Sequence, residues 1–206
     1  MLGTVDPLEP GELDRGGAAT VYRLATSGDP GALRAFVGEA AGRPEGWWVD
    51  VVVPAVAREV LAARSEGRCS EVDVTLALSA LLLLLRDQRA RAPERPASPR
   101  LAVLSSLATH RHRHPLEMQL SLELWAVELE AEGWSTLVEP GLGPMQLSGL
   151  LAQLDVNALG LWLGVAADAH DGVTETLRRR VSRGGADFWT RPERAAAGVA
   201  PALHAR

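Results

Sequence analysis

The sequence predicts an α/β protein in which an N-terminal helical bundle is followed by a small doubly wound parallel-sheet domain. Three observations favour this class. Apolar residues recur at helical spacing up to residue 90, whereas short apolar runs alternate with helical segments from residue 101 onward. Arginine and proline gather between these two regions. With 206 residues, of which 47% are hydrophobic and 23% charged, the chain is also long enough to bury a sizeable core.

Capping residues and apolar spacing predict the first elements. Residues 1–28 predict a flexible lead that contains one short helix, from Ala18 to Ala25. Asp29 is a favoured N-cap residue, and Pro30 is favoured at the first helical position. Apolar residues then continue along one face, so an amphipathic helix is predicted to end near Gly42.

Two more helices complete the predicted bundle. The second runs from Trp47 to Ser65, with Pro54 expected to kink or split it, and Gly67 marks its end. Ser70, three residues before a carboxylate, predicts the start of the third helix. Because that helix is apolar on all sides around its leucine run, we expect other helices to surround it in a bundle over residues 29–90.

The second half begins after a linker predicted at residues 91–99 and occupies residues 100–206. In the segment Leu116–Glu132, the alternation of apolar residues at its start could argue for a strand. Its 17 residues, rich in Leu, Glu and Ala, argue for a helix. Alternating strands and helices predict a parallel sheet with helices on both faces. The predicted strands and helices are, in order, Leu101–Leu107, Leu116–Glu132, Trp134–Val138, Pro144–Leu154 and Val156–Val165.

Composition excludes several functional classes. All 21 cationic residues are arginine, and without lysine the chain cannot be a pyridoxal-phosphate enzyme, a lysine aldolase or a Walker-type ATPase. The net charge of -5 makes direct binding to nucleic acid unexpected. The single Cys69 allows no internal disulfide, and the aliphatic stretch Val74–Leu85 is shorter than the roughly 20 residues that a membrane span needs. We therefore expect a cytoplasmic protein with no membrane partner.

The order of these pieces is similar to that of a known family. The bundle contains Val53-Pro54-Ala-Val-Ala-Arg-Glu-Val-Leu, followed by Gly67. From Val103 to Val165 the chain has a strand, a loop with histidines, a long helix, Gly133-Trp134, a strand, Pro-Gly-Leu-Gly-Pro and a third strand. From Asp29 onward this pattern resembles the cobalamin-binding module of methionine synthase and of cobalamin-dependent light-sensing transcription regulators, in which a four-helix bundle precedes a flavodoxin-like, Rossmann-like domain. No DNA-binding helix-turn-helix is expected before the bundle, so the resemblance implies a stand-alone sensor half.

The resemblance implies where a cobalamin would bind. In that family a histidine in an Asp-x-His-x-x-Gly loop after the first strand ligates the cobalt, and the corresponding loop here runs from Thr109 to Glu117. His114 is best placed to be that ligand, and His112 comes next. The position of the family's glycine is Glu117 when counted from His114 and Pro115 when counted from His112.

Other positions depart further from the family. Trp162-Leu163 stands where the family has a Ser-x-Leu that lines the pocket for the nucleotide tail, and an indole there would fill that space. Arg64, Val74 and Thr75 stand where the light sensors have a tryptophan and a Glu-His pair. The segment after the third strand is expected to be too short for the family's next helix and strand, so the domain is predicted to be truncated. These departures predict that cobalamin binding is lost and leave the cofactor unknown.

The alternating histidines of the loop are candidate metal ligands. In an extended loop, His110, His112 and His114 would face the same side, and with Glu117 or a water they would suit zinc. The alternatives are a solvated loop, or one neutral imidazole that contacts an organic ligand.

Arginines and tryptophans predict the kind of organic ligand. Arg111 and Arg113 alternate with the histidines and would bind phosphate or carboxylate, helped by the N-terminus of the following helix. Indoles supply large flat contact surfaces. An aromatic pocket is therefore predicted from Trp47, Trp48 and Trp162, with Trp125 and Trp134 as further candidates.

Two charged clusters and the lone cysteine are predicted to be structural. Arg178-Arg179-Arg180 and Arg183 lie at the C-terminal end of a helical segment, where they would offset the helix dipole and stay in water. Cys69 adjoins a helix start, which lowers thiol pKa values, but it has no partner at a catalytic spacing. Four glutamates of the long helix are predicted to form an exposed face: Glu123, Glu128, Glu130 and Glu132.

These features predict a stand-alone ligand-sensing or regulatory protein of cobalamin-module ancestry. A planar or anionic small molecule is expected between the bundle and the α/β domain, and a partner protein such as a transcription regulator would detect the change in packing. The alternative is a small-metabolite enzyme on the same scaffold, with His112 or His114 as the acid-base or metal-ligand group. A third alternative is a ligand-free interaction module whose pocket is closed by Trp162.

Overall fold

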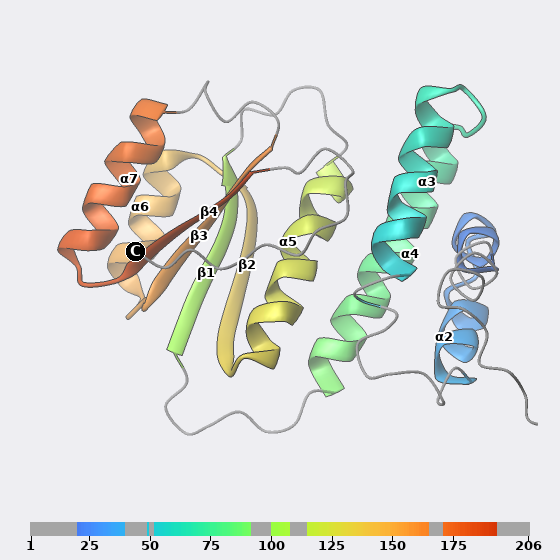
Figure 1. The fold of residues 1–206 in the computed structure, drawn as a ribbon, viewed down its shortest axis with the longest axis horizontal. Helices are drawn as coiled ribbons and strands as arrows, with labels where there is room; N and C mark the ends of the chain where they lie inside the picture. The colour runs from blue at the N-terminus through green and yellow to red at the C-terminus, as the bar shows by residue number, and fades with distance from the viewer. Residues whose placement is uncertain are drawn as a thin grey trace, which may run out of the picture. The chain divides into compact units, whose positions relative to one another are not determined.

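The computed structural model describes residues 20–39, 49, 52–91, 100–107, 115–164 and 171–192. The chain forms two compact units (Figure 1). The helical unit comprises Met1–Arg95 and Arg113–Glu128, and the sheet unit comprises Pro96–His112 and Leu129–Arg206. One helix, α5 (Pro115–Ala131), therefore supplies residues to both units.

The helical unit begins with helical residues 20–26, as predicted, and with α2 (Pro30–Glu39). The predicted N-cap of α2 is confirmed, because the Asp29 Oδ1 atom accepts the Ala32 N–H at 2.9 Å. α3 spans Val53–Ser65, which places Pro54 in its first turn, where the missing N–H leaves no hydrogen bond unmade.

The turn between α3 and α4 (Glu71–Arg91) forms as its sequence predicts. Gly67 adopts a φ of 71°, its N–H donates to the Arg64 carbonyl at 3.0 Å, and the Arg68 N–H donates to the Ala63 carbonyl at 2.8 Å. This is the Schellman arrangement that ends many helices. Ser70 and Asp73 then form a reciprocal capping box, with Ser70 N–H to Asp73 Oδ2 at 2.9 Å and Asp73 N–H to Ser70 Oγ at 3.2 Å.

α4 is the central helix of the helical unit and contacts both α2 and α3. Its buried residues share one core with the other helices, and α5 adds Leu120 to that core. The prediction that other helices surround α4 on all sides is wrong. Val72, Leu76 and Leu83 are exposed and follow each other at spacings of four and seven residues, so they form one apolar stripe open to solvent.

α5 confirms the prediction of a helix where apolar alternation could have indicated a strand. Its residues are buried on two sides. Leu116, Leu120, Leu124 and Val127 join the core of the helical unit, at positions that recur on one face. On another face Leu122, Trp125, Ala126 and Leu129 are also buried.

The sheet unit contains four parallel strands in the order β2-β1-β3-β4. The strands are β1 (Arg100–Leu107), β2 (Trp134–Leu142), β3 (Ala158–Gly164) and β4 (Asp187–Pro192), and the first three confirm the predicted strands. The expectation of a truncated domain is wrong in one respect. The segment after β3 accommodates both a helix, α7 (Asp171–Arg183), and the fourth strand.

One face of the sheet packs against α6 (Pro144–Gln153) and α7 (Figure 1). Val103 of β1 and Leu159 and Leu161 of β3 form a core with Leu147 of α6 and Leu177 of α7. The parallel order matches the start of the flavodoxin-like order 2-1-3-4-5, so the predicted α/β class with a parallel sheet is confirmed. None of the helices among the described residues is long and apolar enough to cross a membrane.

Candidate ligand site at the carboxyl edge of the sheet

The strand order places a candidate site where β1 and β3 end. The chain passes from β1 to β2 on one side, and β3 then pairs with the other side of β1. In open α/β sheets, ligands bind outside the carboxyl ends of the strands at such a reversal point. The segments that leave β1 and β3 there, residues 108–114 and 165–170, lie outside the described residues.

Two buried serines hold the end of β1 against the end of β2. The Ser105 Oγ donates to the Glu139 carbonyl at 2.7 Å, and the Ser106 Oγ accepts the Gly141 N–H at 3.1 Å. The pairing of β1 with β2 shifts register at this point, and Gly141 adopts a φ of 72°, which suits glycine. The two hydroxyls thus replace ladder hydrogen bonds that the irregularity interrupts.

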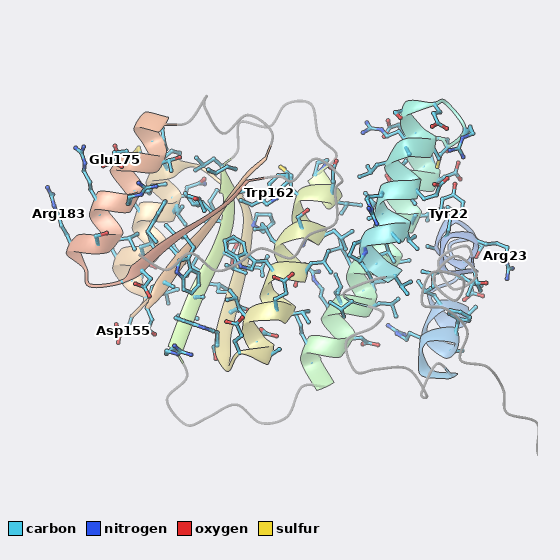
Figure 2. All side chains as sticks on the ribbon, viewed as in Figure 1. Tyr22, Arg23, Asp155, Trp162, Glu175 and Arg183 are labelled. Carbon is cyan, nitrogen blue, oxygen red and sulfur yellow. The ribbon has the colours of Figure 1, made fainter. Side chains whose placement is uncertain are left out.

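Ser106 and Trp162 lie next to each other at the reversal point. They are register partners on β1 and β3, so their side chains lie on the same face of the sheet. The Ser106 hydroxyl accepts one hydrogen bond, and among the described residues no acceptor is found for its own proton. Trp162 is 4% exposed, so its indole is part of the packed interior (Figure 2).

Indoles also meet further along the same face. Trp134 of β2 and Trp189 of β4 come from the two edge strands, and their rings meet edge to face with centroids 5.0 Å apart. The central strands have small residues there, Ala102 on β1 and Gly160 on β3, which leave room for the rings. The Arg100 guanidinium lies 4.1 Å from the centroid of the Trp134 ring, a cation–π contact.

Of the residues predicted to bind the ligand, the structure describes Trp162 and Glu117, and also the two further aromatic candidates, Trp125 and Trp134. Trp162 lies in the sheet unit, and Glu117 lies half-buried in the first turn of α5, in the part assigned to the helical unit. The others lie outside the described residues: Trp47, Trp48, His110, Arg111, His112, Arg113 and His114. The zinc site therefore stays a prediction, and the described residues themselves hold no group of three or more metal-ligating side chains.

The prediction of an exposed Glu123 is wrong. This carboxylate is 2% exposed and lies between two arginines of α4: Arg86 Nε lies 3.0 Å from Glu123 Oε1, and Arg89 binds Oε2. Helical spacing contained the signal that predicts this, because position 123 falls on the same face as Leu120 and Val127, which join the core. A carboxylate on an apolar face requires a cationic partner.

The arginine cluster of α7 is exposed to solvent, as predicted. Arg178, Arg179, Arg180 and Arg183 are exposed. Arg179 pairs with Glu175 at 2.8 Å within the helix, and the Arg178 guanidinium lies 5.4 Å from the centroid of the Phe188 ring.

Cys69 lacks the lowered thiol pKa that a position next to a helix start can give, which agrees with the prediction that this cysteine is structural. Cys69 lines a hollow of about 320 Å³ in the helical unit together with Tyr22, Arg23, Thr26, Ser27, Arg68 and Asp73 (Tyr22 and Arg23 are labelled in Figure 2). Burial raises the pKa of the Cys69 thiol, and the negative charge of Asp73 raises it further. A raised pKa leaves less of the reactive thiolate, as expected of a structural cysteine.

No protein-family model matches this chain, and neither does any curated protein. The solved structures that are similar to it include two cobalamin-related proteins. The methanol:cobalamin methyltransferase complex MtaBC from Methanosarcina barkeri aligns at 12% identity over 94% of this chain and 76% of that chain, with a TM-score of 0.44. A novel cobalamin-binding protein from Desulfitobacterium hafniense DCB-2 aligns at 13% identity over 85% of this chain and 83% of that chain, with a TM-score of 0.41. At such low similarity, function must be argued from the residues of this chain.

Proposed function

We propose that this chain is a ligand-sensing regulatory protein that binds a planar or anionic small molecule at the carboxyl edge of its sheet. The observation that carries the proposal is the Ser106–Trp162 pair at the point where the strand order reverses. The Ser106 hydroxyl, for whose proton the described part of the chain supplies no acceptor, can donate to a ligand, and the Trp162 indole offers a flat wall once the ligand enters. The helical unit would be the bundle half of a module of cobalamin-binding ancestry.

α5 supports a regulatory mechanism. It follows directly on the segment that leaves β1, and its residues are divided between the two units, with Leu120 in the core of the helical unit. Glu123, clamped by Arg86 and Arg89, fixes its first three turns in the helical unit. A ligand that moves the start of α5 would therefore change the packing of that unit, provided that it binds one packing more tightly than the other.

The described residues do not fit the family's way of holding cobalamin. By the resemblance, Trp162 stands in place of the family's small residue on β3, and an indole there, buried as Trp162 is, would fill the space for the nucleotide tail. Val74, in place of an upper-face residue, is fully buried, and Arg64 is paired with Glu71 at 2.7 Å. These observations support the loss of cobalamin binding, and no mechanistic step is assigned to that cofactor.

The loop after β1 would supply the remaining contacts. Arg111 and Arg113 are proposed to bind an anionic group of the ligand, with His112 and His114 beside them. The support is their position in the chain, because the loop starts where β1 ends. Glu117, at the start of α5, would connect ligand binding to the helix.

Native mass spectrometry tests the proposal. The protein is purified without denaturation, and its mass before and after acid unfolding shows whether it carries a non-covalent ligand. Its mass is also measured after incubation with hydroxocobalamin or with flavin mononucleotide, which is a planar anion. We expect a non-covalent small-molecule mass that is reduced in Ser106→Ala and retained in Ser105→Ala, because the Ser105 hydroxyl already donates to Glu139. If the protein carries no added mass under any of these conditions, the proposal of ligand sensing is contradicted. A stoichiometric hydroxocobalamin adduct would show that the interpretation of Trp162 is wrong, and consumption of the bound compound that is lost in His114→Ala would favour the enzyme alternative.

A further inference from the structure

We propose that two copies of this chain associate through α4, whose exposed stripe pairs antiparallel with the same stripe of the second copy. The stripe consists of Val72, Leu76, Ser79 and Leu83, and Arg86 lies at its C-terminal end. It belongs to the helical unit, on a helix that supplies none of the residues proposed to bind the ligand. The inference therefore does not depend on the proposed function.

The first observation is the apolar surface that this stripe exposes. Val72 is 67% exposed, Leu76 41% and Leu83 46%, whereas the other leucines of α4 are buried. Thr75, next to the stripe, donates its hydroxyl to the Glu71 carbonyl at 2.8 Å, so it adds no unpaired donor when the stripe is covered. A contiguous apolar surface of this kind marks a contact site.

The spacing of the stripe indicates that the contact is made by another helix. From Val72 to Arg86 its residues follow each other at spacings of four, three, four and three, which is the heptad spacing of a coiled-coil seam. All five lie within about 80° around the helix, so the stripe runs straight along it for about four turns. A second helix can insert its own side chains between those of such a seam.

The stripe is complementary to itself when the two helices run antiparallel. A two-fold axis between residues 77 and 78 places Leu76 opposite Ser79 of the second copy, because both lie equally far from the axis. Val72 lies opposite Leu83 of the second copy for the same reason. A large side chain thus meets a small one at the centre, and two apolar side chains meet on either side, so the layers can interdigitate.

The charges at the two ends of the stripe favour the same arrangement. Glu71 and Asp73 lie at its N-terminal end, and the Glu71 side chain is 62% exposed although it is paired within its own chain. Arg86 lies at the other end, and its side chain is 52% exposed although it too is paired within its own chain. An antiparallel pair brings the basic end of each stripe to the acidic end of the other, whereas a parallel pair brings like charges together.

Sedimentation equilibrium of the full-length protein tests the association. Because a seam of one helix is smaller than a standard interface of about 1,600 Å², we expect a reversible dimer with a dissociation constant in the micromolar range. Val72→Glu places a carboxylate opposite Leu83 of the second copy, and it should weaken the dimer at least tenfold because that charge would be buried without a partner. The monomer should fold as before, since acidic residues are favoured in the first turn of a helix. Met145→Glu is the matched control: Met145 is 89% exposed on α6, outside the stripe, and its replacement should leave the dimer unchanged.

Disulfide cross-linking tests the orientation. Cys69→Ser removes the only cysteine of the chain, and in this background Leu76→Cys protein is mixed with Ser79→Cys protein that carries a mass label. The antiparallel register brings positions 76 and 79 of different copies together, so the mixed cross-link should form faster than that of either variant with itself. Faster cross-linking of Leu76→Cys with itself would show parallel pairing and overturn the proposed arrangement.

Three results decide the proposal as a whole. A wild-type protein that stays monomeric up to about 1 mM would overturn it and leave the stripe to a helix of another protein. A Val72→Glu protein that dimerises as strongly as the wild type would also overturn it. Ser106→Ala should dimerise as the wild type does, so that failure of this interface is distinguishable from failure of the ligand site between β1 and β3.

Discussion

Glu123 is the residue whose replacement tests the structure of the helical unit most directly. It lies on α5, is 2% exposed, and is bound by Arg86 and Arg89 of α4. Replacement by alanine removes the carboxylate and leaves two guanidinium groups next to an apolar core. The two arginines differ in their access to water, because the Arg86 side chain is 52% exposed and that of Arg89 only 17%.

The expected loss of stability follows from these exposures. Removal of one partner from a fully buried ion pair costs about 3–5 kcal/mol. Arg86 can turn into water when Glu123 is absent, whereas Arg89 stays largely covered, so we expect Glu123→Ala to lower the free energy of unfolding by about 3 kcal/mol, at the lower end of that range. In double-mutant cycles the Arg89–Glu123 coupling should exceed the Arg86–Glu123 coupling, which we expect below about 1 kcal/mol, as for exposed pairs.

Urea unfolding followed by circular dichroism measures these quantities. Glu128→Ala is the matched control, because Glu128 lies on the same helix and is exposed, so its replacement should change stability by less than about 0.5 kcal/mol. The combined replacement Glu123→Leu with Arg89→Met should recover much of the loss, since an apolar pair needs no counter-charge. If Glu123→Ala costs no more than Glu128→Ala, the carboxylate is not buried between the arginines in solution and the packing of α5 described above is wrong.

Three further predictions concern the turn between α3 and α4. Hydrogen bonds from Ser70 lower the pKa of Asp73 in the folded protein. The carboxylate therefore contributes its full stability above about pH 4, and this stability is lost as the pH falls through the folded pKa. Asp73→Asn should accordingly flatten the acid limb of a stability–pH profile. Gly67→Ala should cost about 1 kcal/mol in urea unfolding, because φ is 71° there although a Cβ would meet no atom within 4 Å. Cys69 should react with a disulfide reagent at pH 8 more slowly than an unfolded-chain thiol, because burial raises its pKa; an equal rate would contradict this environment.

Local signals predicted most of the elements because the interactions that define them are local. The Asp29 cap, the Ser70–Asp73 box and the Gly67 turn each involve residues within six positions of one another. The strands β1 and β3 were also predictable, since each is a short run rich in apolar residues that a parallel sheet buries on both faces.

β4 and the candidate site were not predictable in the same way. β4 is a short edge strand with the sequence DFWTRP, and its polar residues give no apolar run; only pairing with β3 makes it a strand. The Ser106–Trp162 pair depends on the register between strands more than fifty positions apart in the chain. Such features follow from tertiary structure and have no periodic signature.

Glu123 also explains how α5 can have one orientation although two of its faces are apolar. Hydrophobic burial is not directional, so an amphipathic stripe normally determines which side of a helix packs inward. On α5 the buried residues Leu120 and Leu122 lie about 200° apart around the helix, and burial alone would select neither side. A carboxylate at position 123 can be buried only where Arg86 and Arg89 meet it, so it excludes other rotations of the helix. Under the proposed regulatory function, the same constraint would turn a shift at the start of α5 into a definite change of packing within the helical unit.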